Sequence, residues 1–122
     1  KIPIQYAISY PDHLITNWSS LDLTEIKTLT FEKPDFKKFP CINLAYNALG
    51  IGGTAPAVLN VANDEAVIAF LNDKIGFLEI PKIIQSAVEN HSYVSNPSIE
   101  EIKEIIIQTK NDVNKYIKDK VK

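Results

Sequence analysis

Apolar residues recur at helical spacing along the last two-thirds of this 122-residue chain. This pattern predicts four helices, which run from about Pro40 to Gly50, Thr54 to Leu71, Ile80 to Asn90 and Ser98 to Lys120. Gly50 is expected to end the first helix and Thr54 to cap the second. Ser98 and Glu101 have the spacing of a capping box, with Asn96 and Pro97 as an alternative start. Residues 39–122 are therefore predicted to form a small four-helix bundle.

The first third of the chain has a different pattern. Ile4–Tyr10 is apolar and lies between two prolines, which predicts one short helix. Leu21–Leu23 and Thr28–Phe31 alternate between apolar and polar residues, as short strands do, and Ile75–Phe77 is a further strand candidate that can pair with the second of them. Residues 1–38 are therefore interpreted as an extended linker arm. The predicted fold is mainly α: the bundle, preceded by an arm with a short helix and one or two short strands.

Composition limits the classes of function. Hydrophobic residues at 45% and charged residues at 23% are typical of a globular domain. A net charge of −2 argues against a nucleic-acid or membrane surface, and the absence of arginine removes the usual bidentate phosphate clamps. No segment has the length of a membrane span or the pattern of a signal peptide. The chain has no methionine, even at position 1, so we expect a piece of a longer protein.

The glycine-rich stretch Gly50-Ile51-Gly52-Gly53 is the first candidate for chemistry. It matches neither the Walker phosphate loop nor the dinucleotide fingerprint, and it follows a predicted helix rather than a strand. Glycine supplies the positive φ that helix ends require. We therefore interpret the stretch as a turn between two helices.

Other reactive side chains do not form a recognisable constellation. Cys41 is a lone cysteine, which indicates a cytosolic protein; its position at a helix start can lower the pKa of a thiol, but a small buried hydrophobe is favoured. His13 and His91 lie in separate segments without metal-ligand spacing. Asp64 and Glu65 are adjacent, so they diverge on a helix and are expected to be solvated. We predict no catalytic, cofactor-binding or metal residue in the chain.

Asn60 and Asn63 lie three residues apart, which places them on one helix face among apolar neighbours. Because asparagine is a poor helix former, the pair is expected to hydrogen-bond something specific. The favoured partner is backbone within the bundle; a ligand or another domain is the alternative.

Several ordered motifs carry a resemblance to a known family. They are Leu29-Thr30-Phe31, Phe39-Pro40-Cys41-Ile42-Asn43-Leu44-Ala45, Gly52-Gly53-Thr54-Ala55-Pro56-Ala57-Val58-Leu59-Asn60-Val61-Ala62-Asn63, and Ile75-Gly76-Phe77-Leu78-Glu79-Ile80-Pro81. In this order they resemble the C-terminal part of 1-deoxy-D-xylulose 5-phosphate reductoisomerase, and Ile2–Ala7 resembles the segment that leaves its catalytic domain. Val61 and Asp64 depart from the family pattern, and so does the tail around Gln108 to Asn111.

The resemblance implies a parent enzyme of the non-mevalonate isoprenoid pathway. Such an enzyme is a homodimer that uses NADPH and a divalent metal, Mg²⁺ or Mn²⁺. Its dinucleotide fingerprint and metal-binding acids lie in the preceding domains, so no catalytic residue carries over to this sequence. The chain is then the structural C-terminal domain, a partner of the catalytic domain, inactive alone, and cytoplasmic or located in a plastid-type organelle.

Two alternatives remain open from the sequence. A free-standing helical protein-interaction module fits an apolar patch formed by Trp18, Leu21 and Leu23. A diverged enzyme that uses Cys41 or His91 is the less favoured one.

Overall fold

The computed structural model describes residues 2–19 and 21–120; their regular secondary structure is helical, with no strand among them. The chain divides into two compact units, residues 1–33 and residues 34–122, and each is described by itself. The predicted mainly helical fold class is confirmed.

The first unit contains two short helices, α1 (Ile2–Ser9) and α2 (Leu23–Ile26). Around α1 the chain folds back locally: the Tyr6 ring stacks on the His13 ring at 4.6 Å, and Gln5 Nε2 donates to the Leu14 carbonyl at 3.2 Å. Trp18 is about half exposed in the same unit.

The strands predicted for this unit are wrong. Asp22, in the middle of the first predicted strand, is instead the N-cap of α2: its Oδ1 accepts from Thr24 N at 2.8 Å and from the Thr24 hydroxyl at 2.6 Å. The hydroxyl bond, with the backbone bond, lowers the pKa of Asp22. Residues 28–31 are irregular, and residues 75–77, the proposed partner, lie in a turn region. An alternating pattern without a neighbouring edge to pair with does not make a strand.

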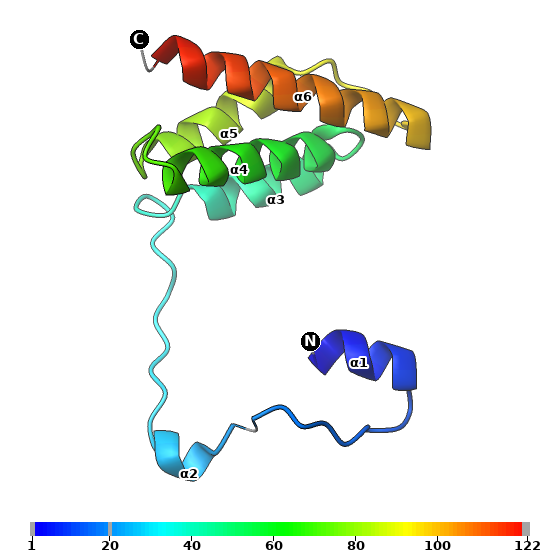
Figure 1. The fold of residues 1–122 in the computed structure, drawn as a ribbon, viewed down its shortest axis with the longest axis vertical. Helices are drawn as coiled ribbons and strands as arrows, with labels where there is room; N and C mark the ends of the chain where they lie inside the picture. Colours follow the sequence, from blue (N-terminus) through cyan, green and yellow to red (C-terminus); the bar gives the residue numbers. More distant parts are fainter. Residues whose placement is uncertain (1, 20, 121–122) are drawn as a thin grey trace. The chain divides into compact units, whose positions relative to one another are not determined.

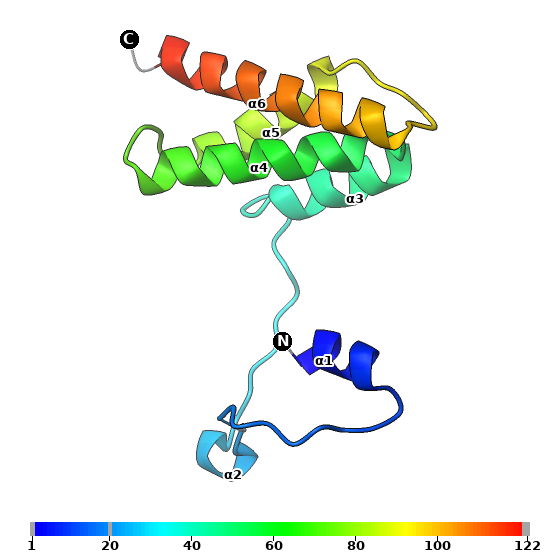
Figure 2. The same ribbon diagram turned by 45° about the vertical axis from the view of Figure 1, so that its right-hand side comes forward.

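The second unit is the four-helix bundle shown in Figures 1 and 2. Its helices are α3 (Cys41–Ile51), α4 (Ala55–Leu71), α5 (Glu79–Asn90) and α6 (Ile99–Lys120). α4 is the central element, because α3, α5 and α6 all pack against it. In both views α3 and α6 lie on opposite sides of α4 and α5.

Small residues on α4 hold the core together. Ala62 and Ala66 are completely buried and contact larger side chains of α5 and α6, and the buried cluster consists of Ala62, Ala66, Ala69, Ile80, Ile83, Ile84, Val113 and Ile117. Because an alanine face allows neighbouring helices to approach closely, one helix can serve as the floor for the three others.

The ends of the last helix are fixed by polar contacts. Ser98 and Glu101 form the predicted capping box: Ser98 N donates to the Glu101 carboxylate at 2.7 Å, and Glu101 N donates to Ser98 Oγ at 3.2 Å. The Ser98 N–H thereby lowers the pKa of Glu101. At the other end Lys120 pairs with Glu79 at the start of α5; Lys120, followed by Lys82, lowers the pKa of Glu79 to about 2.

Candidate functional site

The glycine-rich stretch forms the turn between α3 and α4, although not as predicted in detail. Gly50 lies inside α3, which continues to Ile51. The positive φ occurs at Gly52 (71°) and Gly53 (53°), and Gly52 N donates to the Ala48 carbonyl at 3.0 Å. The prediction that Gly50 ends the helix is therefore wrong by two residues, because the helix ends where the backbone can turn left-handed.

Gly53 brings this turn into direct contact with the loop between α5 and α6. Thr54 N donates to the Val94 carbonyl at 3.0 Å, and Val94 N donates to Thr54 Oγ1 at 3.1 Å. A Cβ on Gly53 would lie 2.2 Å from the Val94 carbonyl oxygen and 3.1 Å from Ser95 Cα. The glycine is therefore required for the close approach of two backbones rather than for binding a phosphate.

Thr54 is completely buried and pairs with His91 across this junction. Thr54 Oγ1 lies 3.0 Å from His91 Nε2, and His91 Nδ1 lies 2.7 Å from the Val88 carbonyl. Because a carbonyl can only accept, the neutral ring carries its proton on Nδ1, and Nε2 accepts from the Thr54 hydroxyl. Thr54 makes no side-chain capping bond, contrary to the sequence prediction, because its oxygen serves this network instead.

A hydroxyl next to an imidazole is also the geometry of an activated nucleophile. Here the Thr54 oxygen accepts the Val94 N–H and has no exposed surface on which a substrate could approach. The arrangement therefore stabilises the junction. The pair is not evident from the sequence, because Thr54 and His91 are 37 residues apart.

The two adjacent acids of α4 differ in environment. Asp64 is exposed, as expected. Glu65 is not solvated as predicted: its carboxylate accepts from Lys110 Nζ at 2.9 Å and from Asn114 Nδ2 at 2.7 Å, both on α6. The Lys110 hydrogen bond is the main cause that lowers the pKa of Glu65. These contacts join α4 to α6.

Asn60 is exposed and Asn63 is half-buried on α4. Within the described residues neither side chain makes a hydrogen bond, so the favoured interpretation, backbone capping inside the bundle, is not what the structure shows. A partner outside these two units remains the alternative.

The remaining reactive side chains are dispersed. Cys41 is half-buried against the core at the start of α3, and burial raises the pKa of its thiol, contrary to the activation that a helix start can provide. His13 belongs to the first unit and His91 to the second. Among residues 2–19 and 21–120, no group of three or more His, Cys, Asp or Glu side chains could hold a metal ion.

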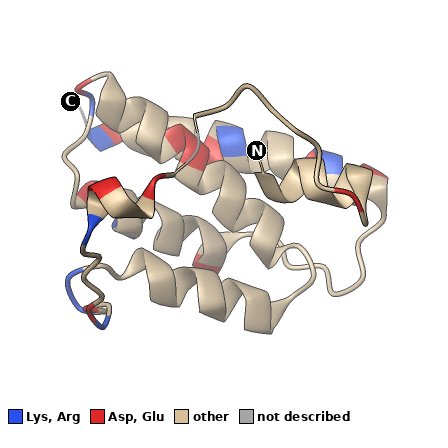
Figure 3. Ribbon diagram, turned by 90° about the horizontal axis from the view of Figure 1, so that it is seen from below, with Lys and Arg blue, Asp and Glu red and all other residues tan. Residues whose placement is uncertain are grey.

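The outer side of α3 is an exposed apolar surface. Tyr46 is 68% and Leu49 71% exposed, and Ala48 is the one residue of this helix that is buried. α3 has no charged residue, so none of its ribbon is red or blue in Figure 3, where charged residues are coloured. In the first unit, Leu21 and Leu23 are likewise exposed, at 70% and 62%. Contiguous exposed apolar patches are typical of interaction surfaces. No described helix is long and apolar enough to cross a membrane.

Residues 1–112 match the family model described as the DXP reductoisomerase C-terminal domain. Among curated relatives, the chain is 49% identical over 119 residues to 1-deoxy-D-xylulose 5-phosphate reductoisomerase of Desulforamulus reducens, covering 98% of this chain and 31% of the relative. It is 50% identical over 117 residues to the enzyme of Geobacillus sp. strain WCH70, covering 95% and 31%. The chain thus spans about a third of the length of the curated relatives it matches.

Solved structures give the same result. The reductoisomerase of Zymomonas mobilis in complex with NADPH matches with a TM-score of 0.81 and 34% identity, over 95% of this chain and 31% of that one. A DOX-P reductoisomerase in complex with magnesium matches with a TM-score of 0.80 and 29% identity, over 98% and 32%. A likeness that covers nearly all of this chain and a third of longer enzymes favours a domain of such an enzyme over a free-standing interaction module.

Proposed function

This chain belongs to the 1-deoxy-D-xylulose 5-phosphate reductoisomerase family as its C-terminal domain, and from that premise we propose that it supports chemistry performed by the rest of the protein. In this proposal residues 1–38 are the linker arm from the catalytic domain, and residues 39–122 are the domain that packs against it. The whole protein is a cytoplasmic homodimer that converts 1-deoxy-D-xylulose 5-phosphate to 2-C-methyl-D-erythritol 4-phosphate.

The residues present do not fit the cofactors of that reaction. The family relatives include structures with NADPH and with magnesium. In this chain the Val94 carbonyl lies directly against Gly53, and the described residues contain no group of three or more His, Cys, Asp or Glu side chains that could hold a metal. We therefore assign NADPH and the divalent metal to the preceding domains and no catalytic residue to this chain.

The observation that carries the supporting role is the apolar side of α3. Tyr46 and Leu49 are three residues apart on α3, and both are largely exposed on the bundle surface. Burial of one such side chain stabilises a contact by about 1.5–3 kcal/mol. This is enough for the surface to hold a domain in place without taking part in chemistry.

A chimera tests the proposal. The C-terminal third of the Desulforamulus reducens relative is replaced by this chain, and substrate-dependent oxidation of NADPH is followed by absorbance. We expect activity from the chimera and none from this chain alone. Leu49→Asp in the chimera is expected to lower activity by about tenfold or more, because it places a charge in the interdomain contact.

Asn47→Asp is the matched control, since Asn47 is an exposed residue of the same helix. It should leave the activity of the chimera within about twofold. Substrate-dependent NADPH oxidation by the isolated chain would contradict the supporting role. If the two α3 variants behaved alike in the chimera, α3 would not be the docking surface.

A further inference from the structure

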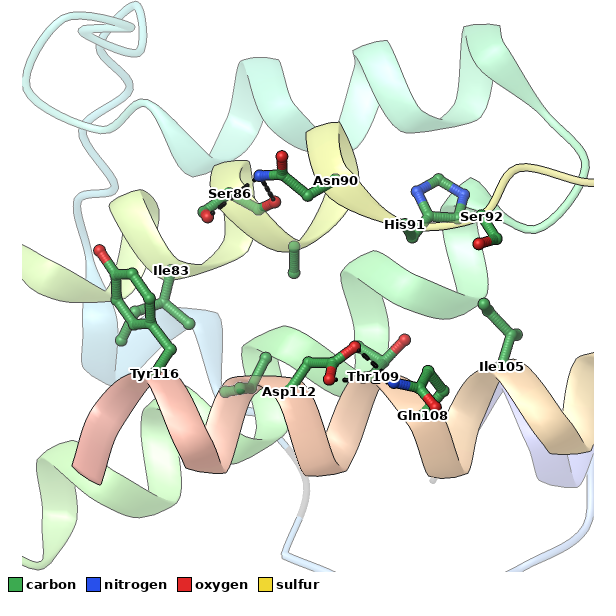
Figure 4. Close-up of a pocket in the computed structure, with 12 residues that line it drawn as sticks. Ile83, Ser86, Asn90, His91, Ser92, Ile105, Gln108, Thr109, Asp112 and Tyr116 are labelled. Carbon is green, nitrogen blue, oxygen red and sulfur yellow. Dashed lines mark hydrogen bonds between the residues drawn. The ribbon is translucent and has the colours of Figure 1, made fainter. Parts of the chain in front are cut away.

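The bundle contains a gap between α5 and α6. Both helices pack on α4 but make little contact with each other. A pocket of about 320 Å³ lies between them, as the close-up in Figure 4 shows. This volume is at the lower end of the range in which proteins bind small organic molecules. The pocket is lined by α5, by α6 and by the start of the loop that follows α5, so it is separate from the exposed side of α3.

The floor of this pocket is apolar. Ile83 and Val113 are almost completely buried there, at 2% and 3% exposure, and Ala87 and Ile105 add further apolar surface. Such a floor favours a ligand with a compact hydrocarbon body, because binding would remove the apolar surfaces of both the ligand and the pocket from water.

The side-chain N–H groups around the pocket are used within the protein. Gln108 Nε2 donates to both Asp112 carboxylate oxygens, at 3.0 and 2.9 Å. Asn90 Nδ2 donates to the Ser86 carbonyl at 2.7 Å, and His91 Nδ1 lies 2.7 Å from the Val88 carbonyl. An anionic ligand would therefore find no free nitrogen donor. The carboxylate of Asp112 retains lone pairs that can accept from a ligand.

The charged side chains around the pocket also favour a cation over an anion. Asp112 is the one Asp, Glu, Lys or Arg among its lining residues. Two lysines of α6 are engaged elsewhere: Lys110 pairs with Glu65, and Lys120 with Glu79. Lys120 Nζ also lies 5.0 Å from the centroid of the Tyr116 ring, so this lining ring already holds one ammonium group.

We propose that the gap between α5 and α6 binds a small organic monocation, a primary ammonium on a compact apolar body. The ammonium donates to the Asp112 carboxylate, and the body lies on Ile83, Ala87 and Val113. The proposal does not depend on the supporting role of α3 or on the activity of the whole protein.

Three probes of similar size and different charge test this site: benzylammonium, benzyl alcohol and benzoate. Each is titrated into the ¹⁵N-labelled chain at neutral pH, and the amide shifts of Ala87 and Val113 are followed by NMR. We expect benzylammonium to bind about 1.5- to fivefold more tightly than benzyl alcohol, the range for one exposed ion pair, and benzoate to bind more weakly than either. Equal affinity for the cation and the alcohol would overturn the proposal, as would shifts confined to other helices or no shift up to the solubility of the probe.

Asp112→Asn isolates the charge, and Asp119→Asn, at an exposed residue of the same helix, is the control. Asp112→Asn should reduce the affinity for benzylammonium to that for benzyl alcohol without changing the affinity for the alcohol. Asp119→Asn should leave the preference for the cation intact. An Asp112→Asn chain that still prefers benzylammonium would show that the carboxylate does not select the ligand.

Discussion

α3 and α4 follow each other along the chain and are both rich in apolar residues, but they have opposite surroundings. α4 buries five residues (Ala55, Val58, Ala62, Ala66 and Ala69), whereas α3 buries Ala48 alone. α4 lies against three other helices, and α3 lies at the side of the bundle. The apolar residues of a helix therefore indicate how much of its surface must be buried. The place of the helix in the fold decides whether the bundle or another part of the protein buries that surface.

The contrast also explains why α3 is informative about function. A helix on the outside of a bundle normally has a polar outer face. The outer face of α3 instead carries Tyr46 and Leu49. We attribute this to the neighbouring domain proposed above, since the bundle itself needs no apolar residue at these positions.

The largest expected effect is at the turn that leads from α3 to α4. Gly53→Ala should lower the free energy of unfolding by on the order of 3 kcal/mol, because the left-handed backbone disfavours a Cβ and the new atom would overlap the Val94 carbonyl. Gly50→Ala, with nothing within 4 Å of the added Cβ, should raise it by roughly 0.5–1 kcal/mol. Chemical denaturation measures both; a similar effect of the two variants would refute the close contact at Gly53.

The next effect compares the same substitution on the two helices. Ala66→Leu enlarges a completely buried residue of α4 and should cost about 1–3 kcal/mol by overpacking. Ala45→Leu enlarges an exposed residue of α3 and should change stability by less than about 0.5 kcal/mol. Thermal unfolding of the two variants provides the measurement. Equal destabilisation would mean that α3 is packed more tightly than its exposure indicates.

The smallest effect separates the two acids of α4. The pKa of Glu65 is lowered from 4.5 in the folded chain, so near this pH the unfolded chain binds more protons and stability falls as the pH decreases through and below about 4.5. Glu65→Gln should remove this contribution and cost about 0.5–1 kcal/mol at neutral pH. Asp64→Asn, on an exposed side chain, should change stability at neutral pH by less than about 0.5 kcal/mol. The midpoints of chemical unfolding of both variants are measured between pH 7 and pH 3. If Glu65→Gln lost as much stability on acidification as the unmodified chain does, the role of the Lys110 contact would be disproved.

Much of the fold was predictable from local patterns. The four bundle helices, the short N-terminal helix and the capping box at Ser98 follow from helical spacing, proline positions and caps, all of which act within a few residues. The resemblance to the reductoisomerase family was also confirmed. The strand predictions failed because an alternation of apolar and polar residues indicates a half-buried strand only when another strand is present to pair with it.

The candidate site was less predictable. The sequence identified Gly53, Thr54 and His91 separately but assigned the glycines to a simple turn and Thr54 to a cap. Their joint role depends on the Val94 backbone, which reaches Thr54 from 40 residues further along the chain. Similarly, Glu65 was expected to be solvated, because its partners Lys110 and Asn114 lie on another helix, far from it in the sequence.

The sequence by itself therefore determined which segments are helices, where most of them begin and end, and to which family the chain belongs, because these depend on near neighbours and on residue identity. Tertiary structure alone decided which apolar helix is buried and which is exposed, which glycine meets another backbone, and which of two adjacent acids is paired. These outcomes depend on contacts between segments distant in sequence, and no local pattern specifies which surfaces will meet.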